Sequence, residues 1–204
     1  TYTTLASIVK YPYESSLAGS HGKFGFFNTE AHTFKKIADE LGILCKSKPG
    51  EPLVYARHPL VYLVEAADDI CYEIMDIEDS HKLKILSFEK TKELLLGFFD
   101  ETIRNSIEQR IIDEGITDDN EKVIYMRACA IGKLENVCAH TFIEHEEDIL
   151  NGTFQGCLID HIPEPQHSAY KRCTEVSIQK IYKSKPVLDV ELSGFKIMET
   201  LMEI

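Results

Sequence analysis

Apolar residues recur at helical spacing along most of this chain. Segments in which they fall three or four positions apart predict helices at about residues 28–41, 59–79, 88–102, 104–114, 120–150, 167–182 and 186–203. Loops rich in glycine and proline separate several of them, at residues 11–25, 45–52 and 152–165. The alternation typical of β-strands is weak. The pattern therefore predicts an all-α protein, with a single helical domain over residues 1–204.

The segment from residue 60 to residue 79 is the most distinctive of these helices. On a helical projection its apolar residues occupy one broad arc, and a second arc is almost purely acidic. The acidic arc contains Glu65, Asp68, Asp69, Tyr72, Asp76 and Asp79. No lysine or arginine occurs from residue 58 to residue 81, so carboxylates one turn apart repel each other without a compensating neighbour.

Two interpretations of this acidic arc remain open from the residues alone. The arc can be a solvent-exposed stripe, or it can be a surface that binds a cation. A solvated stripe usually mixes charges of both signs, because opposite charges four residues apart attract each other. A divalent cation is the simplest candidate to offset the repulsion, since carboxylate oxygens are ordinary ligands of such ions.

The composition is that of an ordinary globular protein, with 44% apolar and 27% charged residues. The net charge of −12 argues against wrapping of nucleic acid, although it allows a local basic pocket for phosphate and nucleic-acid binding as regulation. No apolar run approaches the roughly 20 residues that span a bilayer, so no membrane partner is expected. The six cysteines include no CxxC pair, which predicts reduced core thiols in a cytoplasmic protein.

The acidic helix also carries a family resemblance. Residues 57–79, RHPLVYLVEAADDICYEIMDIED, closely resemble the last metal-binding helix of the deoxynucleoside triphosphate triphosphohydrolases, the dGTPase-like branch of the HD superfamily. Residues 4–12, 23–43, 125–134 and 183–204 resemble other segments of the family in the same order. The resemblance implies an HD-domain-like helical bundle, the C-terminal part of the dGTPase fold. It also implies that the full-length protein hydrolyses dGTP, or other dNTPs, to deoxynucleoside and inorganic triphosphate.

The resemblance assigns the metal and sugar contacts to this helix. Asp68 corresponds to the family's distant metal-binding Asp, and Tyr72 and Asp76 correspond to residues that hold the deoxyribose and its 3′-hydroxyl. The implied cofactor is a divalent metal, Mg²⁺ or Mn²⁺, with Fe²⁺ or Zn²⁺ as alternatives. Carboxylate and imidazole ligands together with phosphate oxygens suit these ions.

The phosphate contacts implied by the resemblance lie near the N-terminus, at Lys10, Tyr11 and Lys23. Further substrate contacts correspond to Arg127, Tyr182 and Glu191. Each of these residues also has a structural explanation, as a surface lysine, a salt-bridge partner, a packing residue at a helix end or a solvated acid. The apolar residues of the last helix are expected to form a core stripe at Leu188, Leu192, Phe195, Met198 and Met202.

One element of the family pattern is absent. No His-Asp dipeptide occurs in the 204 residues, although the family's metal site requires one. We therefore expect the HD-motif helices to lie N-terminal to residue 1, and this segment to be inactive by itself. Members of the family commonly form homo-oligomers, so the resemblance implies self-association. The alternative function is a non-catalytic helical module that binds nucleotide or partner subunits.

Overall fold

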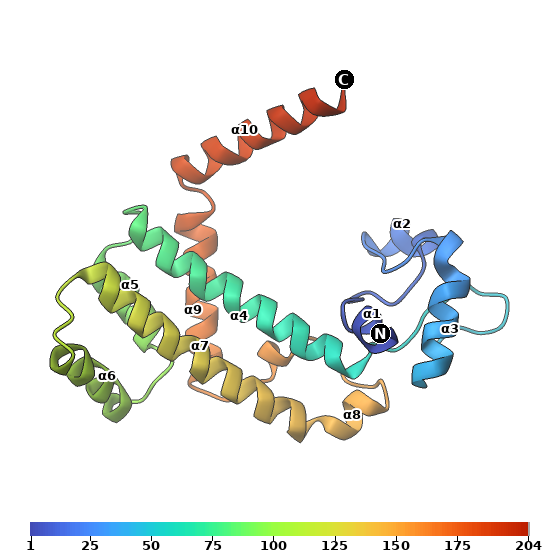
Figure 1. Ribbon diagram of the computed structural model, residues 1–204, viewed down its shortest axis with the longest axis horizontal. Helices are drawn as coiled ribbons and strands as arrows, with labels where there is room; N and C mark the ends of the chain where they lie inside the picture. Colours follow the sequence, from blue (N-terminus) through green and yellow to red (C-terminus); the bar gives the residue numbers. More distant parts are fainter. Residues whose placement is uncertain (204) are drawn as a thin grey trace. The chain divides into compact units, whose positions relative to one another are not determined.

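The computed structural model describes residues 1–203, apart from the side chains of Ser20 and His21. Within this range the chain is helical and forms only isolated β-bridges, which confirms the all-α prediction (Figure 1). The helices are α1 (Tyr2–Ser7), α2 (Ala18–His21), α3 (Ala31–Leu41), α4 (Pro59–Lys82), α5 (Phe88–Leu96), α6 (Glu101–Asp113), α7 (Asp119–Glu144), α8 (Glu146–Leu150), α9 (Gln166–Val176) and α10 (Lys185–Met202). Short 3-10 turns span Ser15–Leu17, Asn28–Glu30 and Leu158–Asp160, and a π-helical turn spans Ser177–Ile181.

Local capping explains where the helix ends differ from the prediction. The helix expected at 88–102 ends at Leu96, because Asp100 caps the next one by accepting a hydrogen bond from the Ile103 amide at 2.9 Å. The long helix expected at 120–150 is divided at His145 into α7 and α8. The helix expected at 167–182 changes to π-helical geometry after Val176.

The chain divides into two compact units. Unit 1 comprises residues 1–68 and 137–162, and unit 2 comprises residues 69–136 and 163–204. Helices α4 and α7 each contribute residues to both units. Each unit is described separately below.

The core of unit 1 lies between α3 and the loops that flank it. Phe26 stacks on Phe34 with ring centroids 4.4 Å apart, and Tyr55 packs against Phe34 at 5.3 Å. Helix α1 packs against α3 in the same unit (Figure 1). A β-bridge between Tyr13 and Val54 ties the loop at residues 11–25 to the segment that enters α4. This core therefore fixes the loop that carries the predicted phosphate residues.

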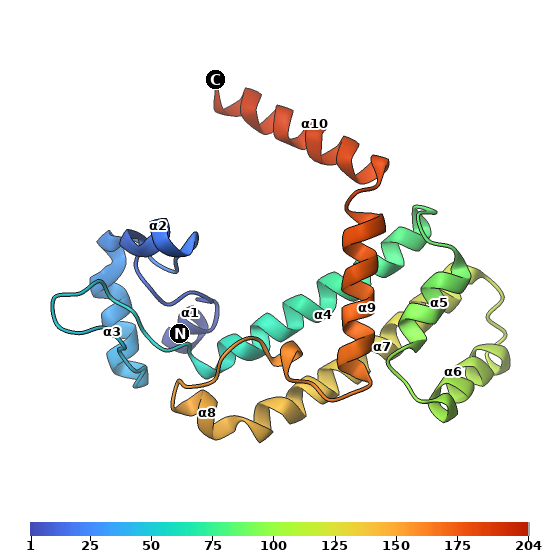
Figure 2. The ribbon, with the colours of Figure 1, turned by 180° about the vertical axis from the view of Figure 1, so that it is seen from behind.

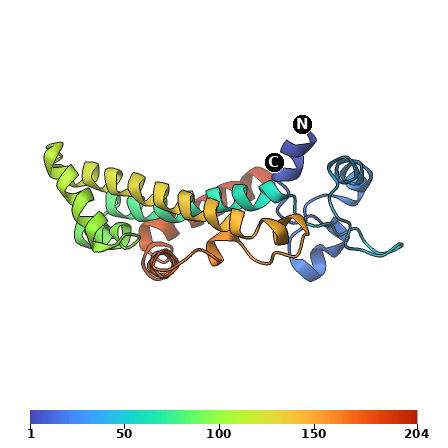
Figure 3. The same cartoon turned by 90° about the horizontal axis from the view of Figure 1, so that it is seen from below.

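In unit 2 the second half of α4 packs against α7 and α9. Figure 3 shows α7 running alongside α4, and Figures 1 and 2 show α9 beside the same helix. Ile74 and Ile77 of α4 are fully buried, as are Met126 and Leu134 of α7. This packing buries one face of α4 and brings polar residues of α9 to its edge.

Helix α10 differs from the sequence prediction. No helix of unit 2 lies along it (Figure 2), and the expected core stripe is exposed at every position. Phe195 has 71% of its surface exposed and Met202 has 84%. The amphipathic pattern correctly predicted the helix, but within the described part of unit 2 no partner buries its apolar face. None of the helices in this range has both the length and the apolar character needed to cross a membrane.

The cysteines are free thiols, as predicted, but only some belong to the core. Cys138 and Cys173 are buried, whereas Cys45 and Cys71 are exposed. Cys45 follows α3 in a loop, and Cys71 lies on an outward-facing turn of α4. Burial raises the pKa of the Cys173 thiol to about 12, so this group stays protonated at neutral pH.

Candidate functional site

The three predicted phosphate residues lie together in unit 1. Lys10 and Lys23 both approach the ring of Tyr11, with their Nζ atoms 5.8 Å and 5.3 Å from its centroid. Lys23 Nζ also donates a hydrogen bond to the Tyr11 hydroxyl at 3.3 Å. We call these three residues the basic cluster. Two ammonium groups around one aromatic ring form a local positive surface on a strongly acidic chain.

A close backbone approach at Gly25 shapes the loop that carries the basic cluster. A Cβ atom at Gly25 would lie 2.2 Å from the carbonyl oxygen of Tyr11 and 2.5 Å from the side chain of Val9. The Gly25 amide donates a hydrogen bond to the carbonyl of Tyr13 at 3.0 Å. Only glycine permits this contact, so Gly25 holds Lys23 and Tyr11 on the same part of the loop.

Glu65 of α4 lies beside the basic cluster and is buried. Its side chain is 2% exposed, and its carboxylate lies 2.7 Å from Lys10 Nζ and 3.1 Å from Arg57 Nη1. The thiol of Cys157 is a further partner at 3.2 Å. Arg57 also donates from Nε to the carbonyl oxygen of Lys10 at 3.0 Å and from Nη1 to that of Gly156 at 3.2 Å. The prediction that Glu65 belongs to a solvated or cation-binding face is therefore wrong.

The other two buried carboxylates of α4 also have partners within the protein. Glu78 forms ion pairs with Lys82 at 2.6 Å and with Arg127 at 2.9 Å. Glu73 accepts hydrogen bonds from Thr174 at 2.8 Å and from Ser177 at 2.6 Å, both in unit 2. The cations and donors that offset the acidic helix come from other segments and from its own last turn, so a metal ion is not needed to explain its charge.

The remaining carboxylates of the acidic face are more accessible. Asp68 is exposed, and Tyr72 has 69% of its surface exposed. Asp76 is half-buried and accepts a hydrogen bond from the Tyr182 hydroxyl at 2.6 Å. Four-residue spacing places Asp68, Tyr72 and Asp76 on one face of the continuous helix α4, which agrees with the sequence analysis.

The described residues do not form a metal centre by themselves. Within residues 1–203 no group of three or more His, Cys, Asp or Glu side chains is arranged to hold a metal ion. An exposed carboxylate such as Asp68 suits a divalent cation chemically, but one carboxylate is too few ligands for a stable site. Asp68 can therefore supply only part of such a centre.

Tyr182 reaches Asp76 because of the π-helical turn that precedes it. The turn at Ser177–Ile181 follows α9 directly, and Tyr182 is its C-terminal cap residue. Burial and the hydrogen bond to the carboxylate of Asp76 raise the pKa of the Tyr182 hydroxyl. The phenol therefore remains a hydrogen-bond donor at neutral pH.

A buried carboxyl group supports this arrangement in unit 2. Burial raises the pKa of Glu73, and the hydrogen bonds from Ser177 and Thr174 partly oppose that shift. Ser177 belongs to the π-helical turn and Thr174 to α9, so Glu73 ties both to α4. The sequence analysis did not single out Ser177 or Thr174. The only sequence feature that points to them is their spacing of three positions on a helix, and two hydroxyl residues at that spacing are common.

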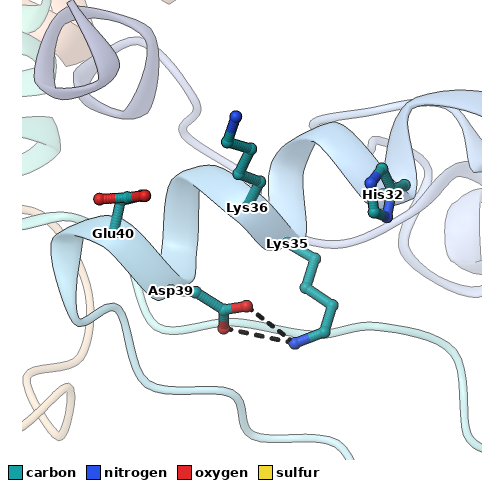
Figure 4. A pocket seen from close by; sticks show the side chains of 5 residues that line it. All are labelled: His32, Lys35, Lys36, Asp39 and Glu40. Atoms are coloured by element: carbon teal, nitrogen blue, oxygen red, sulfur yellow. Dashed lines mark hydrogen bonds and ion pairs between the residues drawn. The ribbon is translucent and has the colours of Figure 1, made fainter.

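Within residues 1–203, two of the predicted substrate residues, Arg127 and Glu191, have no recorded contact with the other predicted site residues. Arg127 forms the salt bridge with Glu78, which is the structural explanation left open for it. Glu191 is exposed on α10, and within the described part of unit 2 no recorded interaction links it to Asp76 or Tyr182. A hollow on the surface of α3, lined by His32, Lys35, Lys36, Asp39 and Glu40, contains none of the predicted site residues (Figure 4).

The sequence matches known proteins over nearly its whole length. It is 31% identical over 207 residues to the deoxyguanosinetriphosphate triphosphohydrolase-like protein of Pseudomonas aeruginosa, a match that covers 99% of this chain and 45% of that protein. It is 32% identical over 214 residues to a protein of the same name from Synechocystis, covering 99% and 45%. It is 26% identical over 222 residues to the deoxyguanosinetriphosphate triphosphohydrolase of Yersinia enterocolitica, covering 100% and 42%. No protein-family model matches the chain.

The structure is all-α, and the sequence is similar to that of triphosphohydrolase-like proteins. The chain is homologous to part of the deoxyguanosinetriphosphate triphosphohydrolase-like proteins, which confirms the resemblance stated above. It spans about half the length of the curated relatives it matches.

Proposed function

We propose that the full-length protein hydrolyses dGTP, or other dNTPs, to a deoxynucleoside and inorganic triphosphate. The observation that carries this proposal is the match over 99% of the chain to relatives named for that reaction. The spacing of Asp68, Tyr72 and Asp76 supports it, because all three residues lie on the same face of α4.

The basic cluster supports a phosphate-binding role. A triphosphate carries several negative charges, and Lys10 and Lys23 can contact its oxygens with charge-assisted hydrogen bonds. Both ammonium groups are held at the ring of Tyr11, so they offer adjacent donors. Glu65 keeps Lys10 against α4, and Asp68 is three residues further along this helix, about 4.5 Å along its axis.

The sugar contacts are proposed at Tyr72, Asp76 and Tyr182. The carboxylate of Asp76 can accept a hydrogen bond from a 3′-hydroxyl, and its bond from Tyr182 fixes its orientation. A tyrosine ring packed against the deoxyribose excludes a 2′-hydroxyl by steric contact, which is the role proposed for Tyr72. Glu191 and Arg127 are proposed as further contacts on the family resemblance alone.

The proposal includes a divalent metal, with Mg²⁺ or Mn²⁺ favoured and Fe²⁺ or Zn²⁺ as alternatives. Asp68 would supply one carboxylate ligand, and the other ligands would come from residues outside these 204. A bound divalent ion polarises a phosphoryl group and lowers the pKa of a coordinated water. The residues of this chain would hold the phosphates and the sugar in place, and homo-oligomers are the proposed assembly.

One reaction tests the proposal. The full-length protein is incubated with dGTP and Mg²⁺ or Mn²⁺, and the phosphate products are separated. Release of inorganic triphosphate together with deoxyguanosine is the expected result. Release of pyrophosphate or of single phosphate would assign a different reaction.

A non-catalytic helical module is the second candidate function. The observation that favours it is the incomplete donor set around Asp68 within residues 1–203. Such a module would bind dNTP without product formation. Calorimetric binding of dGTP by full-length protein that releases no triphosphate with either metal would support this alternative over the enzyme.

A further inference from the structure

Glu65 restrains Lys10 both directly, at its side chain, and through Arg57, at its backbone. Its Oε1 atom lies 2.7 Å from the Nζ atom of Lys10. Its Oε2 atom lies 3.1 Å from Nη1 of Arg57, and Nε of the same guanidinium donates to the carbonyl oxygen of Lys10 at 3.0 Å. One buried carboxylate therefore fixes the side chain of the lysine directly and its backbone through the arginine.

We propose that Glu65 is a positioning residue that holds Lys10 for contact with the substrate triphosphate. This inference rests on the proposed function, which places Lys10 among the phosphate contacts. A lysine side chain has four rotatable bonds, and ordering it on binding costs conformational entropy. A lysine that is already ordered by an ion pair avoids much of this cost.

The charges around Glu65 allow it to orient Lys10 without repelling an anion. Its side chain is 2% exposed, whereas that of Lys10 is 40% exposed. An approaching phosphate therefore meets the ammonium group and not the carboxylate. An ammonium group has three N–H donors, so it can contact a carboxylate and a phosphate oxygen at the same time. Arg57 also neutralises Glu65 while Lys10 contacts the ligand.

A purely structural ion pair is the competing explanation, and α4 provides a matched control for it. Glu78 lies on the same helix, its side chain is also 2% exposed, and it also pairs with two cations, Lys82 and Arg127. Loss of either carboxylate removes a doubly paired buried charge from α4. Only the loss of Glu65 removes the ion pair to Lys10 together with the carboxylate that orients Arg57.

The experiment uses the full-length protein with Glu65→Gln and Glu78→Gln. Inhibition of dGTP hydrolysis is measured with inorganic triphosphate, which probes the phosphate contacts, and with deoxyguanosine, which probes the rest of the site. We expect Glu65→Gln to weaken inhibition by inorganic triphosphate about tenfold, because one charge-assisted contact is lost. Inhibition by deoxyguanosine should change less than twofold, and Glu78→Gln should leave inhibition by inorganic triphosphate unchanged.

Three results would overturn the proposal. Glu65→Gln could weaken both inhibitors equally, which indicates general damage to the fold. It could bind inorganic triphosphate more tightly, which makes Glu65 a competitor of the phosphate. Glu78→Gln could produce the same selective loss. If wild-type protein releases no triphosphate from dGTP, the proposed function fails, and calorimetric titration with inorganic triphosphate still compares the variants.

A second variant covers the case in which Glu65→Gln does not fold. Arg57→Lys keeps a positive charge beside Glu65 but removes the guanidinium that reaches the carbonyl oxygen of Lys10. It should weaken inhibition by inorganic triphosphate severalfold and leave deoxyguanosine unaffected. An equal effect on both inhibitors, or no effect on triphosphate, would contradict the positioning role.

Discussion

The hydroxyl group of Tyr182 donates a hydrogen bond to Asp76 Oδ2 at 2.6 Å, although more than one hundred residues separate them. The bond depends on the π-helical turn at Ser177–Ile181, which directly precedes the tyrosine. Ser177 in that turn is itself bonded to Glu73, one turn before Asp76 on α4. The orientation of Asp76 is thus set by a segment that sequence inspection assigned to an ordinary helix.

Tyr182→Phe tests whether this bond orients Asp76. We expect a loss of about 0.5–1.5 kcal/mol in the free energy of unfolding, the usual contribution of one hydrogen bond. Under the proposed function, KM for dGTP should also rise severalfold. Denaturant titration and steady-state kinetics of the full-length protein measure the two effects.

Tyr170→Phe is the matched control for this variant. Its hydroxyl donates to the carbonyl oxygen of Asp69 at 3.1 Å, so its loss removes a comparable bond that does not involve Asp76. Stability should fall by a similar amount with KM unchanged. An equal rise of KM in both variants would show that Tyr182 acts only through the stability of unit 2.

Glu73→Gln should make stability less dependent on pH. Burial raises the pKa of Glu73, so the folded state holds this proton more tightly than the unfolded state does. The resulting stability is fully present below the ordinary value of 4.5 and is lost as pH rises through the raised folded pKa. Glutamine does not ionise, and Thr174 can accept from its amide while donating to the Tyr170 carbonyl at 3.2 Å.

Thermal unfolding between pH 4 and pH 8 measures this effect. The Tm of Glu73→Gln relative to wild type should rise with pH and then level off above the folded pKa of Glu73. Glu175→Gln, which removes an exposed carboxylate of α9, controls for the change in net charge. A Tm difference that stays constant across the range would contradict the assignment of Glu73 as a group with a raised pKa.

Gly25→Ala should disturb the basic cluster. The added methyl group would meet the backbone oxygen of Tyr11 at 2.2 Å, and backbone has little room to shift. We expect a loss of about 1–3 kcal/mol in the free energy of unfolding, typical of overpacking. Gly19→Ala is the control, because nothing lies within 4 Å of its added methyl group. Equal stability of the two variants in urea titrations would refute the close approach.

Asp68→Asn should separate activity from stability. Asp68 is exposed, so the free energy of unfolding should change by less than about 0.5 kcal/mol. Triphosphate release from dGTP should fall on the order of 100-fold or more, since even residues that only support a metal ligand cost 10–100-fold. Asp79→Asn removes another exposed carboxylate of α4 and should retain activity. Full activity of Asp68→Asn would remove this residue from the proposed metal site.

The helices themselves follow from the sequence. Apolar residues at helical spacing and the caps at Ser87 and Asp100 are local features, and local hydrogen bonding is enough to form and end a helix. The shared face of Asp68, Tyr72 and Asp76 follows from their spacing alone. The resemblance also groups Lys10, Tyr11 and Lys23, which lie together in the structure.

Tertiary structure decided how the charges are compensated and which apolar faces are buried. The sequence left the acidic face of α4 open between a solvated stripe and a cation-binding surface, but Lys10 and Arg57 neutralise Glu65 from segments that no local pattern connects to it. It predicted a core role for Phe195, which is exposed because no helix of unit 2 packs along α10. Both outcomes depend on contacts between residues far apart in the chain, and helical periodicity reports only which side chains share a face.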